Sequence, residues 1–280
     1  IVGQSKIERL TKLAQSSKIA VSLDSIEVAQ SISEAARQAR CHIQILVEFD
    51  VGMHRCGLQS ISEWLRVAQE VDQLQNLQFK GLMFYPGHIW DPPDQQSAAL
   101  NQLSATIEEI RLESEKAGLA METVSGGSTP TAYNSHRVRG LTEIRAGTYV
   151  FYDMNEFSAG FCQLSQCALR VLVTVVSHAV EGHAMIDGGS KTFSGDRLRS
   201  GDRLGFGRVT EYPDIQFVSM SEEHGHLDVS RSDYKPRIGD KLAVIPNHVC
   251  TCVNMHDQIY YHRKGVVETV WAVEGRGKIR

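Results

Sequence analysis

Residues 42–50, His-Ile-Gln-Ile-Leu-Val-Glu-Phe-Asp, form a mostly apolar run that ends in an acidic residue. The length of the run and its β-branched and aromatic residues predict a strand. Residues 26–40 before it carry apolar side chains at helical spacing, and residues 60–75 after it are predicted as a second helix. A strand between two helices is typical of a βαβ unit, so this stretch predicts a parallel sheet covered by helices.

The alternation of strand and helix continues through the first half of the chain and then stops. From about residue 164 the pattern changes to short alternating apolar runs between Gly, Pro and Asp turns, without a long helix. The second half therefore predicts an antiparallel, barrel-like β domain, with a boundary near residues 155–165. Further strands of the first half are predicted at residues 18–25, 79–85, 121–125 and 142–149, with a long helix near residues 95–117.

The composition excludes several classes of protein. The 280 residues are 42% hydrophobic and 22% charged and have a formal net charge of −4, as in an ordinary globular protein. No Lys/Arg cluster indicates a nucleic-acid-binding face, and no apolar run approaches the roughly 20 residues of a membrane span. The six cysteines are scattered and suggest no disulfide framework, so we expect a reducing, cytoplasmic location.

Polar loops follow the predicted strands at the edge where parallel α/β proteins place their chemistry. Residues 50–57, Asp-Val-Gly-Met-His-Arg-Cys-Gly, contain two glycines that permit a tight turn and place Arg55 as a fixed cation. Residues 85–88, Tyr-Pro-Gly-His, offer His88 as a general base, a role that suits histidine at neutral pH. The alternative interpretations are a surface arginine and a histidine that only caps a strand end.

Two segments contain glycine and small polar residues. The first follows the fourth predicted strand, and the second lies at the end of the fifth. Residues 125–129, Ser-Gly-Gly-Ser-Thr, and residues 146–148, Ala-Gly-Thr, offer small side chains, hydroxyls and backbone N–H groups. Such segments bind phosphate groups well. Neither matches a P-loop or a dinucleotide fingerprint, and each alone is compatible with an ordinary turn. Two of them at successive strand ends predict a phosphate-bearing ligand.

Residues 246–254, Pro-Asn-His-Val-Cys-Thr-Cys-Val-Asn, follow the apolar run of residues 241–245. We expect His248 and Cys250 at the end of that strand, where residues i and i+2 point to the same side. One imidazole and one thiolate suit zinc and leave positions open for water or substrate. The alternative is a half-buried strand end with an inert thiol.

The ordered set of motifs resembles one enzyme family. Together the motifs resemble the D-threonine aldolase and D-serine dehydratase family of pyridoxal-phosphate (PLP) enzymes. The resemblance implies an α/β fold, with a partial alanine-racemase-type barrel over residues 1–160 that binds PLP. It also implies an antiparallel β domain over residues 161–280 that carries a metal site. The motifs, in chain order, are Asp50-x-Gly-x-x-Arg55-x-Gly57, Tyr85-x-Gly-His88, Gly126-Gly-Ser-Thr-Pro130, Glu143-Ile-Arg-x-Gly-Thr-Tyr149 and Pro246-Asn-His-x-Cys250.

The resemblance also implies a role for each matched residue. Arg55 would contact the phenolic oxygen of PLP, and Arg145 would lie near its pyridine ring. His88 would act as the base on the substrate hydroxyl. Because relatives of this barrel work as dimers, a homodimer is expected. The phosphate would be held by Gly127, Ser128, Gly147 and Thr148, and a divalent ion, zinc or manganese, by His248 and Cys250.

These roles fit two reactions of D-β-hydroxy amino acids. Cleavage of the Cα–Cβ bond of D-threonine would give glycine and acetaldehyde, and this D-threonine aldolase activity is the prediction. Loss of water would make the protein a D-serine dehydratase, which the soft thiolate of Cys250 favours. Further alternatives are a non-catalytic PLP-binding relative and a structural α/β protein in which His248 and Cys250 are inert.

The chain departs from the family at the lysine that holds PLP. The family places this lysine on the first barrel strand, and Lys6, Lys18 and Lys191 do not match that position. The chain also begins at Ile1 rather than Met, and residues 1–3 resemble the end of a strand. We therefore expect about two strands and the Schiff-base lysine before residue 1, and an open sheet edge in this segment.

Overall fold

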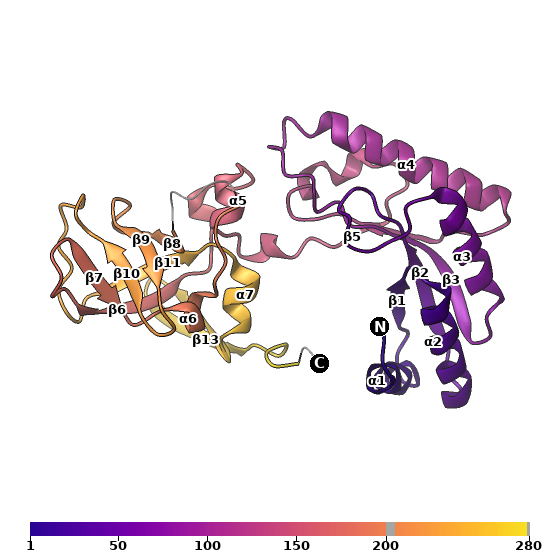
Figure 1. The fold of residues 1–280 in the computed structure, drawn as a ribbon, viewed down its shortest axis with the longest axis horizontal. Coiled ribbons are helices and arrows are strands. Elements are labelled where there is room, and N and C mark those ends of the chain that lie inside the picture. Colours follow the sequence, from indigo (N-terminus) through magenta and orange to yellow (C-terminus); the bar gives the residue numbers. More distant parts are fainter. Residues whose placement is uncertain (200–204, 279–280) are drawn as a thin grey trace. The chain divides into compact units, whose positions relative to one another are not determined.

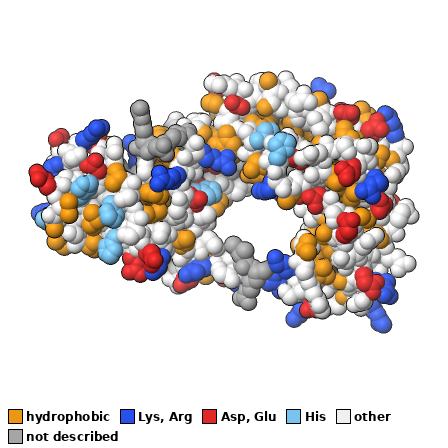
Figure 2. Space-filling model, in the orientation of Figure 1, with side chains coloured by type: hydrophobic (Ala, Val, Ile, Leu, Met, Phe, Trp, Pro, Cys, Tyr) orange, Lys and Arg blue, Asp and Glu red, His pale blue; other side chains and the backbone are white. Residues whose placement is uncertain are grey.

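The computed structural model describes residues 1–199 and 205–278 of the chain. The chain divides into two compact units, Ile1–Gly147 and Thr148–Arg280. Figure 1 shows the first unit as a sheet with helices along it and the second as a small barrel with short helices. On the face drawn in Figure 2, acidic and basic side chains are interspersed. None of the helices in the described part of the chain has both the length and the apolar character that a membrane span requires.

The first unit alternates strands and helices, which confirms the predicted fold class. Its strands pair in the order β1-β2-β3-β4-β5, and every pair is parallel. The sheet is open, with β1 and β5 as its edge strands. The elements are α1 (Gln4–Ala14), β1 (Ala20–Leu23), α2 (Ile26–Ala39), β2 (Ile43–Glu48), α3 (Ile61–Gln73), β3 (Leu77–Met83), α4 (Ser97–Lys116), β4 (Thr123–Gly126), the 3-10 helix η1 (Ala132–Arg137) and β5 (Glu143–Ile144).

Helix α3 is capped by serine and anchored to the sheet by a tryptophan. Ser60 Oγ accepts a hydrogen bond from Glu63 N (3.2 Å) and so satisfies one of the free N–H groups at the helix start. Trp64 is fully buried, and its indole Nε1 donates to Val47 O of β2 (3.0 Å). Its ring meets Phe79 of β3 edge to face, with centroids 6.0 Å apart. These contacts hold α3 over β2 and β3, whose carboxyl ends carry the candidate site.

A β-bulge between β2 and β3 places Gly81 where only glycine fits. Ile45 pairs with Phe79, but Leu46 pairs with Gly81, so β3 contains one extra residue at this point. Gly81 has a φ of 139°, and a Cβ built on it would lie 2.0 Å from the carbonyl oxygen of Thr123 in β4. The close approach of β3 and β4 therefore requires a residue without a side chain at position 81.

The second unit contains a closed antiparallel barrel, which confirms the predicted β domain. The strand order around the barrel is β10-β7-β6-β11-β8-β9. The elements are η2 (Thr148–Val150), α5 (Met154–Ser158), η3 (Leu164–Gln166), β6 (Val171–Ser177), β7 (His183–Ile186), α6 (Ser190–Phe193), β8 (Gly207–Val209), β9 (Gln216–Met220), β10 (Gly225–Asp228), β11 (Lys241–Pro246), α7 (Val249–Asn254), β12 (Gln258–Arg263) and β13 (Val266–Ala272).

Residues 148–167 pack against the barrel near the end of β11. Tyr152, Met154 and Cys167 form a small buried apolar cluster with Ile245 of β11. This burial removes apolar surface from water and holds the segment in the second unit. The segment thereby brings α5 next to the start of α7, which follows β11.

Strands β12 and β13 form a hairpin that, in the described part of the chain, pairs only with itself. Every residue of β13 is exposed, including Val266 (67%) and Trp271 (50%). Tyr261 of β12 contacts Trp271 across the hairpin, with ring centroids 5.6 Å apart. A two-stranded ribbon of this kind has little buried area of its own to stabilise it.

Some predictions of local structure are wrong. Residues 1–2 are not part of a strand, and the fifth strand is limited to Glu143–Ile144, because residues 148–150 form a 3-10 helix instead. The alternating apolar runs of the second half, residues 168–176, 184–186, 215–218, 241–245 and 266–273, do not include β8, β10 and β12. Their short segments carry polar residues, such as His226 in β10 and Arg263 in β12, so they lack clear apolar alternation.

Candidate active site

The first candidate cluster lies on the loop that follows β2. Asp50 Oδ1 accepts hydrogen bonds from Gly52 N (2.9 Å) and His54 N (3.0 Å), which folds the loop into a tight turn. Burial would raise the pKa of Asp50, but these bonds and the His54 imidazole hold it at about 2. Gly57 ends the turn with a φ of 101°, and a Cβ there would lie 2.5 Å from Asp50 N. The turn therefore presents Arg55 from a fixed backbone.

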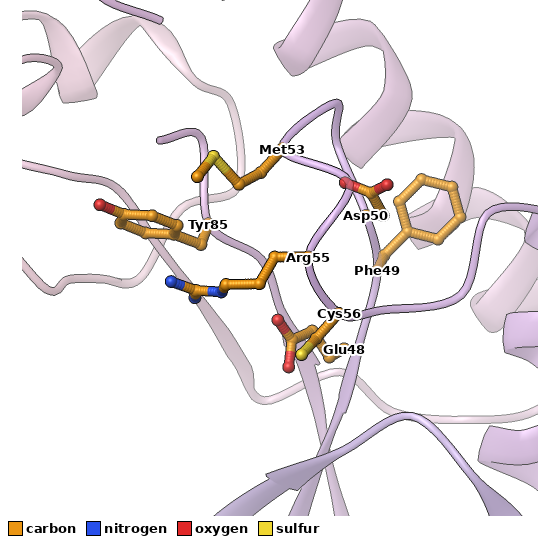
Figure 3. Close-up of a pocket in the computed structure, with 7 residues that line it drawn as sticks. All are labelled: Glu48, Phe49, Asp50, Met53, Arg55, Cys56 and Tyr85. Atoms are coloured by element: carbon orange, nitrogen blue, oxygen red, sulfur yellow. The ribbon is translucent and has the colours of Figure 1, made fainter. Parts of the chain in front are cut away.

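Arg55, Tyr85 and Glu48 line one small pocket at the carboxyl ends of β2 and β3 (Figure 3). The Arg55 guanidinium lies over the Tyr85 ring, 4.7 Å from the ring centroid, which is a cation–π contact. Arg55 is exposed to solvent, so its guanidinium is accessible to an anionic ligand. The pocket thus offers a cation whose direction is set by an aromatic ring.

Glu48 is a member of this pocket that the sequence motifs do not single out. It is the last residue of β2 and is 9% exposed. Burial raises the pKa of its carboxyl and Asp24 raises it further, whereas Arg55 and Arg145 lower it. A buried carboxyl next to two arginines at a strand end is typical of a functional site. The one feature of the sequence that could have indicated Glu48 is its position as a single acidic residue within the apolar residues 45–49.

Glu48→Gln is expected to change how stability depends on pH. Because burial raises the pKa of Glu48, the folded protein ionises this group less readily than the unfolded chain does. The stability that the protonated acid contributes is complete below the unfolded pKa and is lost as pH rises through the folded pKa. Glutamine does not ionise, so urea denaturation should find the variant more stable than wild type at about pH 8 but not at about pH 4.

The matched control for this prediction is Glu143→Gln, which changes an exposed acid of β5. It should leave the pH dependence of stability as it is in wild type. The prediction for Glu48 is wrong if both variants follow the wild-type profile.

Arg145 is anchored just after β5. Its Nη2 donates to Phe84 O (2.6 Å), and its Nε donates to Ser125 Oγ (3.0 Å). These two bonds join the ends of β3, β4 and β5 and hold the guanidinium within electrostatic reach of Glu48. The position of Arg145 beside a pyridine ring stays a prediction.

Gly127 and Gly147 leave open space where a side chain would stand. A Cβ built on Gly147 meets no atom within 4 Å, and one on Gly127 first meets Ile144 at 3.6 Å. Open backbone of this kind suits the close approach of a phosphate group, so these residues fit PLP. Ser128 is less accessible, because its backbone N–H donates to Thr131 Oγ1 (3.0 Å) and the residue is buried.

His88 lies on the loop after β3 and rests against the loop after β2. A Cβ built on Gly52 would lie 3.0 Å from both Cε1 and Nε2 of His88, so the imidazole covers that glycine. His88 is exposed, which allows its ring to exchange protons with a ligand. The predicted base and Arg55 therefore come from two loops in contact, residues 50–57 and 85–88.

The second candidate cluster lies in the second unit, at the start of α7. The prediction that His248 and Cys250 end a strand is wrong, because His248 is the N-cap residue of α7 and Cys250 lies in its first turn. Their side chains nevertheless lie close enough to interact electrostatically. The extended backbone of His248 (φ −137°, ψ 115°) allows this convergence. Cys252 points elsewhere, since its buried thiol donates to Thr192 O (3.3 Å).

Two residues from the start of the second unit contact this pair. Asp153 Oδ2 lies 3.1 Å from His248 Nδ1, and Thr148 Oγ1 lies 3.8 Å from Cys250 Sγ. The hydrogen bonds to Asp153 and then to Cys250 raise the pKa of His248 to about 10, and His248 in turn lowers the pKa of Cys250. A metal ion that binds both would displace a proton from the pair.

The donor set fits a divalent ion whose coordination is completed by water or substrate. Within residues 1–199 and 205–278, no group of three or more His, Cys, Asp or Glu is arranged to hold a metal. His248 and Cys250 supply two donors, an imidazole nitrogen and a thiolate, and this combination suits zinc. The His248 side chain is 34% exposed, so an ion bound there would keep positions open. The metal therefore stays a proposal.

Comparison with known proteins identifies the family. A family model described as "Alanine racemase, N-terminal domain" matches residues 1–155, and one described as "Putative serine dehydratase domain" matches residues 168–262. The chain belongs to the alanine-racemase-type family of D-threonine aldolases and D-serine dehydratases. The predicted family is thereby confirmed, and its members are PLP-dependent enzymes that act on D-amino acids.

Individual members of the family align with nearly the whole chain. A D-threonine aldolase of Arthrobacter sp. is 30% identical over 99% of this chain and 72% of its own length. A 3-hydroxy-D-aspartate aldolase of Paracoccus denitrificans is 32% identical over 98% of this chain and 71% of its own length. The crystal structure of D-threonine aldolase from Filomicrobium marinum has a TM-score of 0.90 at 28% identity and covers 100% of this chain and 76% of that one.

Proposed function

We propose that the protein is a PLP- and divalent-metal-dependent lyase that cleaves D-threonine to glycine and acetaldehyde. The observation that carries the proposal is that His248 and Cys250 lie together at the start of α7, each in contact with the segment that begins the second unit, in a chain that resembles D-threonine aldolases over its length. Two donors with open coordination positions suit the hydroxyl of a D-β-hydroxy amino acid. In this proposal residues 1–160 bind PLP, residues 161–280 carry the metal site, and the protein is a homodimer.

The first unit would contribute most of the PLP site. Arg55 would contact the phenolic oxygen, and the Tyr85 ring keeps its guanidinium in place. Arg145 would lie near the pyridine ring, held by Phe84 O and Ser125 Oγ. Bound PLP supplies an electron sink for the negative charge that develops at the substrate Cα. The phosphate would be held by Gly127, Ser128, Gly147 and Thr148.

The second unit would contribute the metal through His248 and Cys250, with zinc as the expected ion. Such an ion acts as a Lewis acid that lowers the pKa of the substrate hydroxyl. His88 would take the proton from that hydroxyl, and the carbonyl of acetaldehyde forms as the Cα–Cβ bond breaks. The electron pair of that bond passes to Cα, which then takes up a proton to complete glycine.

Dehydration of D-serine to pyruvate and ammonia is the second candidate function. The thiol of Cys250 favours it because a thiolate prefers zinc, and residues 168–262 match a serine dehydratase domain. In this reaction a base removes the Cα proton and the hydroxyl leaves as water. A non-catalytic PLP-binding protein is the third candidate, because none of Lys6, Lys18 and Lys191 matches the lysine of the family motif.

The test uses the full-length protein, loaded with PLP and with zinc or manganese. We expect acetaldehyde and glycine from D-threonine, none from L-threonine as the matched control, and loss of activity on chelation that added metal restores. Release of a 2-oxo acid and ammonia without aldehyde would favour the dehydratase. Absence of both products, together with no lysine adduct after borohydride reduction, would make the protein non-catalytic and the proposal wrong.

A further inference from the structure

We propose that Asp153 is a positioning residue of the metal site. Its carboxylate holds His248 so that Nδ1 carries a proton and Nε2 presents its lone pair to the ion. The inference rests on the metal-binding role proposed above for His248. It assigns a function to a fully buried side chain that no sequence motif marks.

Asp153 accepts three hydrogen bonds, and two of them reach the metal-binding segment. Its Oδ2 accepts from Val249 N (3.0 Å) and lies 3.1 Å from His248 Nδ1. Its Oδ1 accepts from Glu156 N (3.1 Å). An ionised carboxylate can only accept hydrogen bonds, so the proton between Asp153 and His248 belongs to Nδ1. Nε2 is then the nitrogen left for a ligand, the arrangement in which a carboxylate orients a metal-binding histidine.

The carboxylate is rigid because it joins the first residues of two helices. Asp153 is the N-cap residue of α5, and His248 is the N-cap residue of α7. One acceptor therefore fixes the backbone of α7 as well as the imidazole. Asn155 strengthens this link, since Asn247 O accepts from its backbone N (3.2 Å) and from its Nδ2 (2.9 Å). The segment around α5 thus sets the position of the residue before His248 too.

A cap with only a structural role is the competing interpretation, and two substitutions separate the two roles. Asp153→Asn replaces one carboxylate oxygen with an NH2 group. With its oxygen on the Glu156 N side, the amide nitrogen faces His248 Nδ1 and Val249 N, so the bond from Val249 N is lost, Nδ1 must accept, and the proton moves to Nε2. In Asp153→Ser the hydroxyl still caps α5 but is too short to reach His248. Asn155→Ala is the matched control, because it removes only the side-chain bond to Asn247 O, keeps the backbone bond from Asn155 N, and leaves the bonds of Asp153 to His248 and Val249 in place.

The first experiment measures zinc affinity. Metal-free, full-length protein is titrated with zinc in competition with a chelating dye, and circular dichroism shows that each variant folds. Asp153→Asn and Asp153→Ser are expected to weaken zinc binding by about 10- to 100-fold, and Asn155→Ala to leave it at the wild-type value. Wild-type zinc affinity in a folded Asp153→Asn protein would overturn the inference.

A second measurement decides the inference even if the wild-type protein binds no zinc, a result that would refute the proposed metal site itself. Nitrogen-15 chemical shifts of His248 in the metal-free protein report which ring nitrogen carries a proton. We expect a protonated Nδ1 in wild type and an unprotonated Nδ1 in Asp153→Asn. If Nδ1 has the same protonation state in both proteins, Asp153 does not determine which ring nitrogen of His248 carries the proton. That result would refute its positioning role.

Discussion

His248→Asn in the full-length protein is expected to lower kcat/KM for D-threonine by about three orders of magnitude. Asparagine places its Nδ2 near the position of the imidazole Nδ1, so the hydrogen bond to Asp153 can be kept while the proposed metal ligand Nε2 is lost. Without the ion, the substrate hydroxyl keeps its ordinary pKa and gives up its proton less readily. Metal content, measured by elemental mass spectrometry, should fall together with activity.

His262→Asn is the matched control, because His262 is an exposed histidine on β12. It should retain both the metal and the activity. Cys250→Asp adds a second comparison: a carboxylate is a harder ligand than a thiolate, so we expect partial activity that manganese supports better than zinc. Full activity in a metal-free His248→Asn protein would contradict the proposed mechanism.

Gly81→Ala is expected to lower the free energy of unfolding by about 3 kcal/mol. The new Cβ would lie 2.0 Å from Thr123 O, and a backbone atom cannot move aside as the end of a flexible side chain can. Strands β3 and β4 must therefore separate or change register. Because the loops after these strands carry Tyr85 and Gly127, PLP retention should fall as well. Urea denaturation and the absorbance of bound PLP measure the two effects.

Gly118→Ala separates the steric effect from the cost of the backbone conformation. Gly118 follows α4 with a φ of 76°, and a Cβ built on it meets no atom within 4 Å. Only the left-handed conformation is unfavourable there, at a cost of about 1 kcal/mol. Equal losses of stability in the two variants would mean that the contact between β3 and β4 tolerates a side chain.

The sequence predicts the helices of the first unit well, because the apolar face of a helix is a local pattern. α2 (Ile26–Ala39) and α3 (Ile61–Gln73) begin and end within two residues of the predicted ranges. β8 and β10 show the opposite case. β10 reads Gly-His-Leu-Asp, and it is a strand because β7 and β9 pair with it on both sides, which no local pattern reveals.

The candidate site also contains features that a local sequence pattern predicts and features that depend on the folded chain. The loop positions of Arg55 and His88 could be predicted, since each follows a clear strand in a loop with glycine, and their roles stay predictions. The helix that starts at His248 could not, because His248 makes no side-chain cap of its own and Asp153 accepts the hydrogen bond from Val249 N instead. Asp153 is 95 positions away from His248 in the sequence, so only the folded chain brings this cap into place.

The exposed hairpin of β12 and β13 has a consequence for spectroscopy. The chain has three tryptophans, and Trp64 is fully buried beneath α3 whereas Trp271 stands on the hairpin, half exposed. A soluble quencher such as iodide should therefore extinguish the red-shifted emission of Trp271 and spare the blue-shifted emission of Trp64. The fluorescence of Trp271 therefore reports on the surroundings of the hairpin. Any contact that covers β13 would protect this emission from the quencher.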